Sequence, residues 1–395
     1  MKHKFLFILL FSLVLEGMVT TQAVAGDYVH QVNTLIGTKG TGLTSGYLYP
    51  GATYPYGMVQ FTPSYFSKRS GFVINQLSGG GCEHMGNFPT FPVKGKLKMS
   101  PDNILNYRIN VSEEKGHAGY YEAMVQEDIK AKLTVTERTG MASYEYPADQ
   151  QYGTIIIGGG ISATPIEQAA IVITAPNKCE GYAEGGNFCG LRTPYKVYFV
   201  AEFDTDAFET GTWKREELMP NTTFAEGEYS GVYFTFDVNK KKNIQYKIGV
   251  SYVSVENARE NLKAENAEWD FQKIQNQAEA KWNHYLGMIE VEGTNPDRTT
   301  QFYTHLYRSF IHPNVCSDVN GEYMGADFRV HKSRSKHYTS FSNWDTYRTQ
   351  IQLLSMLDPE VASDIVISHQ LFAEQSGGSF PRWVMANIET GVMQG

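Results

Sequence analysis

The hydrophobic pattern of this chain changes at Glu256, and the change requires two unlike halves. From about Lys96 to Val255, apolar residues alternate with polar ones or form short runs, which is typical of strands. From Glu256 to Leu286 there is no Gly or Pro, and apolar residues recur at helical spacing. Strands without intervening helices favour an antiparallel sandwich. We therefore predict a β-sandwich followed by a mainly helical part.

The strand signal is clearest where Ile129, Ala131, Leu133 and Val135 alternate with polar residues, as in a half-buried strand. A short strand is also expected from Met58 to Phe61. Further apolar runs predict strands at 155–157, 197–203, 232–238 and 248–255.

The helical part begins with one long helix or two shorter ones over 256–286, which we interpret as an interdomain linker ended by Gly287. Most of the chain after Gly293 is expected to be helical. A helix is predicted from Thr346 to Leu357. Another should start at Asp358, with Pro359 in its first turn, and run to Gln375.

The N-terminus has the three parts of a secretory signal peptide. Basic residues precede an apolar run from Phe5 to Leu15, and Ala23-Val24-Ala25 gives a cleavage site. The apolar run is shorter than the roughly 20 residues of a spanning helix. We expect residues 1–25 to be removed and the remainder to be periplasmic or secreted, without a membrane segment.

Charge and cysteine content limit the possible partners. The formal net charge is -8, with no basic patch, so nucleic acid is not an expected partner. Cys179 and Cys189 flank a short Gly-rich stretch that a disulfide could close in an oxidising compartment, and the sequence leaves this pairing open. No Cys/His spacing resembles a zinc site.

Two stretches carry candidate ligand-binding residues. In FSNWDTYR at 341–348, we place Trp344 and Asp345 on a loop between helices, where an indole face and a carboxylate could hold a sugar. In LSGGGCEH at 77–84, three glycines allow close approach of a ligand, but on composition alone a plain turn between strands is the better explanation.

A set of motifs in fixed order resembles glycoside hydrolase family 92, the calcium-dependent exo-α-mannosidases. The motifs span nearly all of the chain after the signal peptide. They are VNTLIGT (32–38), PGATYPYGMVQ (50–60), LSGGGC (77–82), KAKLTVTERTG (130–140), GGNFCG (185–190), IEVEG (289–293), FYTHLYRSFIHPN (302–314), FSNWDTYR (341–348), SFPRW (379–383) and MQG (393–395).

The resemblance implies a signal peptide (1–25), an antiparallel β-sandwich (26–255), a helical linker (256–293) and the beginning of an (α/α)6 barrel (294–395). It also implies calcium as cofactor and an α-mannoside glycan as substrate, cleaved with inversion at a terminal mannose. Activity on α-1,2 linkages is common in the family. This chain departs from the usual family run at 72–79, so the linkage is not predicted firmly.

By the resemblance, Trp344 and Asp345 contact the terminal mannose, with Arg382 and Trp383 beside them. Cys82, Glu83 and His84 belong to a sandwich loop on the leaving-group side. The predicted substrate-binding residues are therefore Trp344, Asp345, Arg382, Trp383, Cys82, Glu83 and His84. The metal ligands are not predicted.

The family's catalytic acid and base lie downstream of the last motif, so we expect neither in this chain, which ends at Gly395. Asp364, Glu374 and Glu389 are nearby carboxylates that we assign to surface roles. We expect the 395 residues to be inactive by themselves. The alternatives are a secreted carbohydrate-binding protein without catalysis, and a different hydrolase or phosphorylase with a similar two-part architecture.

Overall fold

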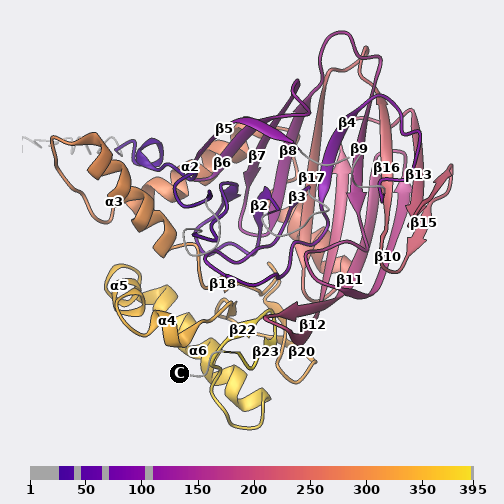
Figure 1. The fold of residues 1–395 in the computed structure, drawn as a ribbon. Helices are drawn as coiled ribbons and strands as arrows, with labels where there is room; N and C mark the ends of the chain where they lie inside the picture. The colour runs from indigo at the N-terminus through magenta and orange to yellow at the C-terminus, as the bar shows by residue number, and fades with distance from the viewer. Residues whose placement is uncertain (1–25, 40–45, 65–70, 103–109, 393–395) are drawn as a thin grey trace, which may run out of the picture.

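Two antiparallel sheets form the larger part of the molecule (Figure 1). The computed structural model describes residues 26–39, 46–64, 71–102 and 110–392. The predicted signal peptide and the MQG motif lie outside these residues. The first sheet has the strand order β1 (Ala52–Thr53), β2 (Gln60–Pro63), β3 (Phe72–Val73), β4 (Thr90–Lys94), β9 (Tyr152–Gly158), β16 (Ser230–Asp237), β13 (Glu209–Lys214) and β14 (Glu217–Pro220).

The second sheet contains the longest strands of the chain. Its order is β15 (Phe224–Glu226), β10 (Ile166–Ala175), β11 (Lys178–Phe188), β12 (Leu191–Phe203), β17 (Asn243–Ser251), β8 (Thr139–Glu145), β7 (Ile129–Val135), β6 (Tyr120–Val125) and β5 (Val111–His117). The inward faces of the two sheets enclose one continuous apolar core, to which Phe61, Leu133 and Phe234 contribute. This is the predicted sandwich, and the strand predicted from the alternation at 129–135 is β7.

The predicted helical stretch after the sandwich is two helices, α1 (Val255–Glu265) and α2 (Phe271–Leu286), and Gly287 caps the second. Val255, predicted as the end of a strand, instead begins α1 because Ser254 accepts the N–H of Asn257 and caps the helix. Helix α1 packs on β12 and β17, and α2 packs on β7 and β8. Both helices therefore lie on the outer face of the second sheet.

The remaining chain mixes helices with short strand pairs, so the prediction that it is mostly helical was too simple. The helices are η1 (Val29–Gln31), near the N-terminus, and α3 (Pro296–Ser309), α4 (Asn343–Thr346), α5 (Gln350–Leu357) and α6 (Pro359–Gln375). The strands are β18 (Asn314–Val315), β19 (Glu322–Met324), β20 (Val330–Lys332), β21 (Tyr338–Thr339), β22 (Val384–Met385) and β23 (Ile388–Glu389). Figure 1 shows α4, α5 and α6 beside the lower end of the sandwich.

Two local predictions in this region differ from the structure. The helix predicted over 346–357 is interrupted at Thr349, whose φ is 67°, a value that no α-helical residue adopts. Trp344 and Asp345 lie in the short helix α4 and not on a loop. The prediction for α6 is confirmed: Asp358 accepts the N–H of Val361, and the helix ends at Gln375.

The disulfide joins Cys82 to Cys189, and Cys179 and Cys316 are buried free thiols. A Cys179–Cys189 bond is excluded because Cys179 is the second residue of β11 and Cys189 follows its last residue. At about 3.3 Å per residue, an extended strand holds these positions roughly 30 Å apart. Cys82 comes from the Gly-rich loop, so the bond fastens that loop to the β11–β12 turn.

Among the described residues, none of the helices combines the length and the apolar character that crossing a bilayer would require.

Candidate functional site

Antiparallel backbone pairing brings two of the sequence motifs together. The N–H of Val384 donates to the carbonyl of Phe341 at 2.9 Å, and the N–H of Asn343 donates to the carbonyl of Arg382 at 3.0 Å. Ser342 and Trp383 form the bridge between them. FSNWDTYR and SFPRW are therefore two sides of one structural unit.

A pocket of about 430 Å³ opens on this unit and is lined by Asn343, Trp344, Tyr347, Pro381 and Arg382. Small-molecule sites usually have volumes of roughly 300–1,000 Å³. Trp344 is 39% exposed, so its ring is available to a ligand. The pocket combines two aromatic rings with one guanidinium group, and no carboxylate is among its lining residues.

Asn343 is held in one orientation by its neighbours. Its side-chain nitrogen donates to the carbonyl of Pro381 at 2.8 Å and lies 3.0 Å from Nε2 of His369. The other nitrogen of His369, Nδ1, donates to the carbonyl of Ile365 at 2.8 Å. Burial lowers the pKa of His369, so the imidazole is neutral and Nε2 accepts from Asn343. These contacts with Pro381 and His369 hold Asn343, and with it one wall of the pocket, in place.

Asp345 lies next to the pocket but does not line it. It is exposed, and its carboxylate accepts a hydrogen bond from the hydroxyl of Ser342. The N–H of Asp345 in turn donates to the carbonyl of Ser342 at 3.0 Å. Ser342 and Asp345 thus fix the start of α4, and the carboxylate keeps further acceptor capacity.

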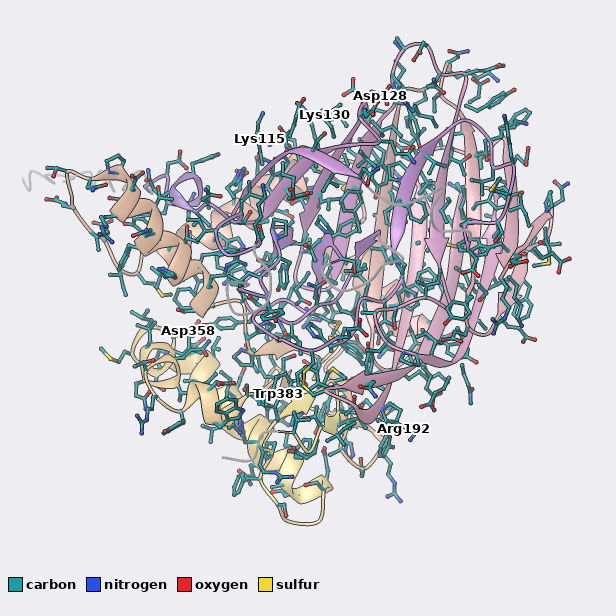
Figure 2. The ribbon with its side chains drawn as sticks, in the orientation of Figure 1. Lys115, Asp128, Lys130, Arg192, Asp358 and Trp383 are labelled. Carbon is teal, nitrogen blue, oxygen red and sulfur yellow. A yellow bond between two sulfur atoms is a disulfide. The ribbon has the colours of Figure 1, made fainter. Side chains whose placement is uncertain are left out.

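Arg382 and Trp383, adjacent in sequence, have different environments. Arg382 lines the pocket, and its Nε is 3.8 Å from the carboxylate of Glu389. Trp383 is buried, with its ring centroid 4.5 Å from that of Phe188. Figure 2 shows Trp383 at the junction between the helical segment and the lower end of the sandwich. Trp383 therefore connects the two parts and does not line the pocket.

The Gly-rich loop reaches the same junction from the sandwich side. Cys82 is bonded to Cys189, and the neighbouring Phe188 lies 5.9 Å from the ring of His84. His84 is fully buried: its Nδ1 donates to the carbonyl of Cys82 at 2.6 Å, and its Nε2 accepts the N–H of Leu77 at 2.9 Å. Burial lowers its pKa to about 4, against which the two backbone hydrogen bonds act. Of the three predicted loop residues only Glu83 is exposed.

The nearby carboxylates accept hydrogen bonds from local donors. Glu389 accepts the N–H groups of Arg382 at 2.8 Å, Trp383 at 3.4 Å and Gly391 at 3.1 Å. Asp364 accepts the N–H of Lys336, and Glu374 accepts from Gln370. Each carboxylate has a local donor, and none lines the pocket.

The pocket also lacks a calcium-type ligand set in the part of the chain that the structure describes. Calcium takes six to eight oxygen ligands, several of them from carboxylates. Within the described residues, one group of three or more His, Cys, Asp or Glu side chains has its ligand atoms close together. It consists of His30, His117 and Glu279, on other elements. The described residues that line the pocket therefore supply no carboxylate ligand to a calcium ion.

A second cavity of about 610 Å³ lies where α1 and α2 meet the β7–β8 turn, and its charged lining residues are Glu137, Glu265 and Lys281. Glu137 pairs with Lys336 at 2.6 Å, and Glu265 pairs with Arg138 at 2.7 Å. Mutual neutralisation of these charges makes this cavity part of an ion-pair network.

Sequence reasoning missed Asn343, Tyr347 and Pro381 as pocket residues. All three lie within the two motifs it selected, and Tyr347 stands one helical turn after Trp344. That spacing was the available signal for Tyr347.

Two family models match consecutive parts of the chain. The Glycosyl hydrolase family 92 N-terminal domain matches residues 31–251, and the Glycosyl hydrolase family 92 catalytic domain matches residues 257–395.

The chain is also similar to solved structures and to a curated relative. A family GH92 α-mannosidase from Bacteroides thetaiotaomicron has a TM-score of 0.84 and 26% identity, covering 93% of this chain and 52% of that one. A GH92 inverting mannosidase from the same organism has a TM-score of 0.80 and 26% identity, covering 93% and 51%. An uncharacterized secreted glycosidase of Arthroderma benhamiae is 26% identical over 86% of this chain and 48% of its own length. The chain thus spans about half the length of these relatives.

Proposed function

Because this chain belongs to glycosyl hydrolase family 92, we propose that it takes part in hydrolysis of α-mannosides and that its pocket holds the terminal mannose. The observation that carries the proposal is the backbone pairing that places Trp344 and Arg382 on one pocket. One solved family member is described as an α-mannosidase in complex with mannoimidazole, which supports a mannoside ligand.

The pocket residues have chemistry suited to a sugar. The partly exposed indole of Trp344 offers a flat apolar face to C–H groups. Arg382 offers N–H donors to hydroxyl oxygens, and Asp345 offers an acceptor at the rim because its bond to Ser342 occupies part of its capacity only. Trp383 would support Arg382 from behind.

The Gly-rich loop forms the other part of the proposed site. Glu83 is the exposed member that could meet the leaving group. Cys82 and His84 would act by position, because the disulfide and two backbone hydrogen bonds already engage their polar atoms.

Inversion belongs to the proposal through a relative described as an inverting mannosidase. An inverting enzyme needs an acid and a base whose carboxyl groups are about 6.5–9.5 Å apart across the sugar. No carboxylate lines the described pocket, so we assign sugar binding, and not acid–base catalysis, to the residues named here. This observation favours carbohydrate binding without catalysis as the second candidate function of the 395 residues.

Calcium dependence is part of the proposal through the family alone. Since the described residues at the pocket do not form a calcium site, no step is assigned to the metal.

Export of the protein is proposed on three grounds. The first 25 residues have the pattern of a signal peptide, although they lie outside the described residues. A Cys82–Cys189 bond suits an oxidising compartment, and the fungal relative is described as secreted.

Mannoside binding can be tested by ligand-observed NMR titration with methyl α-mannopyranoside. A parallel titration with methyl α-glucopyranoside tests whether the pocket distinguishes the two sugars. We expect selective binding of the mannoside and its loss in Trp344→Ala. Phe380→Ala is the matched control, because Phe380 is exposed but does not line the pocket. Equal binding of both sugars, or an unchanged Trp344→Ala, would remove the pocket from the proposal.

Catalysis is tested separately with linkage-defined mannobioses, including the α-1,2 isomer. We expect binding without turnover from the 395 residues. Release of mannose by this chain would contradict our assignment of its carboxylates, and release of glucose from glucosides would favour a different hydrolase.

A further inference from the structure

Three side chains with metal-ligating atoms meet on the side of the molecule where η1 lies against β5 and α2 (Figure 1). They are His30 of η1, His117 at the end of β5, and Glu279 of α2. One ligand atom from each lies within 4.8 Å of the others. The three segments are far apart in the sequence, so no sequence motif indicates the cluster.

His117 and Glu279, the inner pair of this cluster, contact each other and are partly shielded from water. His117 Nε2 lies 2.8 Å from Oε1 of Glu279, which also accepts from Gln275 at 2.7 Å. The His117 ring stacks on Tyr120, with the centroids 5.0 Å apart. These contacts hold the Glu279 carboxylate in one place beside the His117 ring.

His30 completes the cluster from the solvent side. Its ring centroid lies 4.6 Å from that of His117. Its Nδ1 lies 2.5 Å from a carboxylate oxygen of Asp27, which leaves Nε2 as the nitrogen available for coordination. A carboxylate on the second nitrogen of a metal-binding histidine is a recurrent arrangement, because it fixes the tautomer and makes the imidazole more basic.

We propose that His30, His117 and Glu279 form a binding site for a divalent transition metal of the zinc class, with Asp27 as the outer partner of His30. Two imidazoles and a carboxylate are a zinc-type donor set, whereas calcium requires oxygen ligands throughout. Three protein ligands leave the fourth tetrahedral position to water.

The distances are compatible with such a site after small side-chain movements. With metal–ligand bonds of about 2.0–2.1 Å, neighbouring ligand atoms of a tetrahedral zinc lie roughly 3.3 Å apart. The pair formed by His117 and Glu279 is already near this separation at 2.8 Å. The largest gap, up to 4.8 Å, can close by rotation of the His30 side chain, which is 55% exposed.

The site would fasten the first turn of the exported chain to the sandwich and to α2. Because these segments separate on unfolding, metal binding would stabilise the folded state by mass action. This role does not depend on mannoside binding, since the cluster and the pocket lie on different elements.

The test is zinc binding by the tag-free chain, after EDTA treatment and desalting, measured by competition with a chromophoric chelator. We expect one Zn²⁺ per chain, no competition from Ca²⁺, and a zinc-dependent rise in melting temperature. His117→Ala and Glu279→Gln should abolish the tight binding, and Asp27→Asn should weaken it by roughly tenfold or more. His305→Ala is the matched control, because His305 is an exposed histidine on α3 outside the cluster.

Melting curves in EDTA show whether each variant is folded, and Glu279→Gln preserves side-chain size if His117→Ala does not fold. Equal zinc affinity in the Glu279→Gln and His305→Ala variants would overturn the proposal, as would zinc binding that Ca²⁺ displaces. Absence of stoichiometric binding would reduce the cluster to a His–Glu hydrogen bond.

Discussion

At the scale of single residues, the bond between Cys82 and Cys189 is the main covalent constraint on the Gly-rich loop. It closes a segment of 107 residues and joins two places that meet only in the folded chain. We predict that the double variant Cys82→Ser, Cys189→Ser loses about 2–4 kcal/mol of unfolding free energy, because the bond restricts the unfolded chain. Urea denaturation measures the loss.

Chemical reduction supplies the control for this prediction. Cys189 is exposed, so a dithiol reductant should reach the bond and produce the same loss in the natural chain. The reductant should leave the double variant unchanged. Similar stability of the natural and double-variant chains under oxidising conditions would show that the bond is absent or without effect.

The residue scale also shows what the sequence could and could not reveal about the site. Trp344 could be selected because an indole beside a carboxylate suits a sugar, and Arg382 was selected through the family resemblance of its motif. The partner of Cys189 could not, because short spacing suggested Cys179 and only the extended course of β11 rules that pairing out. The burial of Trp383 on Phe188 likewise depends on a contact between distant segments.

At the scale of elements, Arg138 connects the β7–β8 turn to α1 and to the segment after β18. Its Nε donates to the carbonyl of Ser317 at 2.7 Å, and its Nη1 lies 2.7 Å from Glu265. Burial raises the pKa of Glu137, but the charges of Arg138 and Lys336 outweigh it and lower the pKa. The Glu137 carboxylate is therefore held in its ionised form in part by the charge of Arg138.

We predict that Arg138→Met lowers the unfolding free energy by about 3–5 kcal/mol, because the half-buried Glu265 loses its ion-pair partner and Ser317 loses a buried hydrogen bond. Arg192→Met is the control: Arg192 pairs with Glu167 at 2.6 Å, but the pair is exposed to solvent and should contribute far less. Figure 2 shows Arg192 at the lower edge of the sandwich. Urea titrations of both variants make the comparison, and equal losses would contradict the importance of burial.

The helices show which elements are determined by the local sequence. Helix α6 was predictable because Asp358 and Pro359 mark its start within the sequence itself. The break at Thr349 was not, because distant contacts maintain it: the side chain of Gln350 donates to the carbonyls of Ser309 and His312. The short strand pairs after α3 also require partners that lie many residues away.

At the scale of the whole molecule, several buried histidines make stability depend on pH. Burial lowers the pKa of His84 and His312 from 6.5 to about 4, and that of His337 to about 3. These groups are neutral in the folded chain and take up protons more readily when it unfolds. Their contribution is complete above pH 6.5 and is lost as the pH falls toward the folded pKa values.

We predict that the unfolding free energy falls steeply between pH 6.5 and 4, with a slope of roughly 1.4 kcal/mol per pH unit for each such histidine. Urea midpoints across this range measure the slope. His312→Gln should flatten the profile, whereas His305→Gln should not, because His305 is exposed. A flat profile in the natural chain would mean that these histidines titrate normally.

Exposed apolar side chains on α5, on α6 and just after α6 affect the association of whole molecules with one another. Met356 is 80% exposed and Val366 is 66% exposed, and Phe380, after α6, is 67% exposed. Exposed apolar side chains favour association, while the net charge of -8 opposes it. We therefore predict reversible self-association that strengthens with salt, because salt screens the repulsion.

Light scattering should show the double variant Met356→Lys, Val366→Lys to be more monomeric than the natural chain. Val330→Lys, an exposed position on β20, should leave association unchanged. A weaker association at high salt would show that charge pairing, and not apolar contact, brings the molecules together.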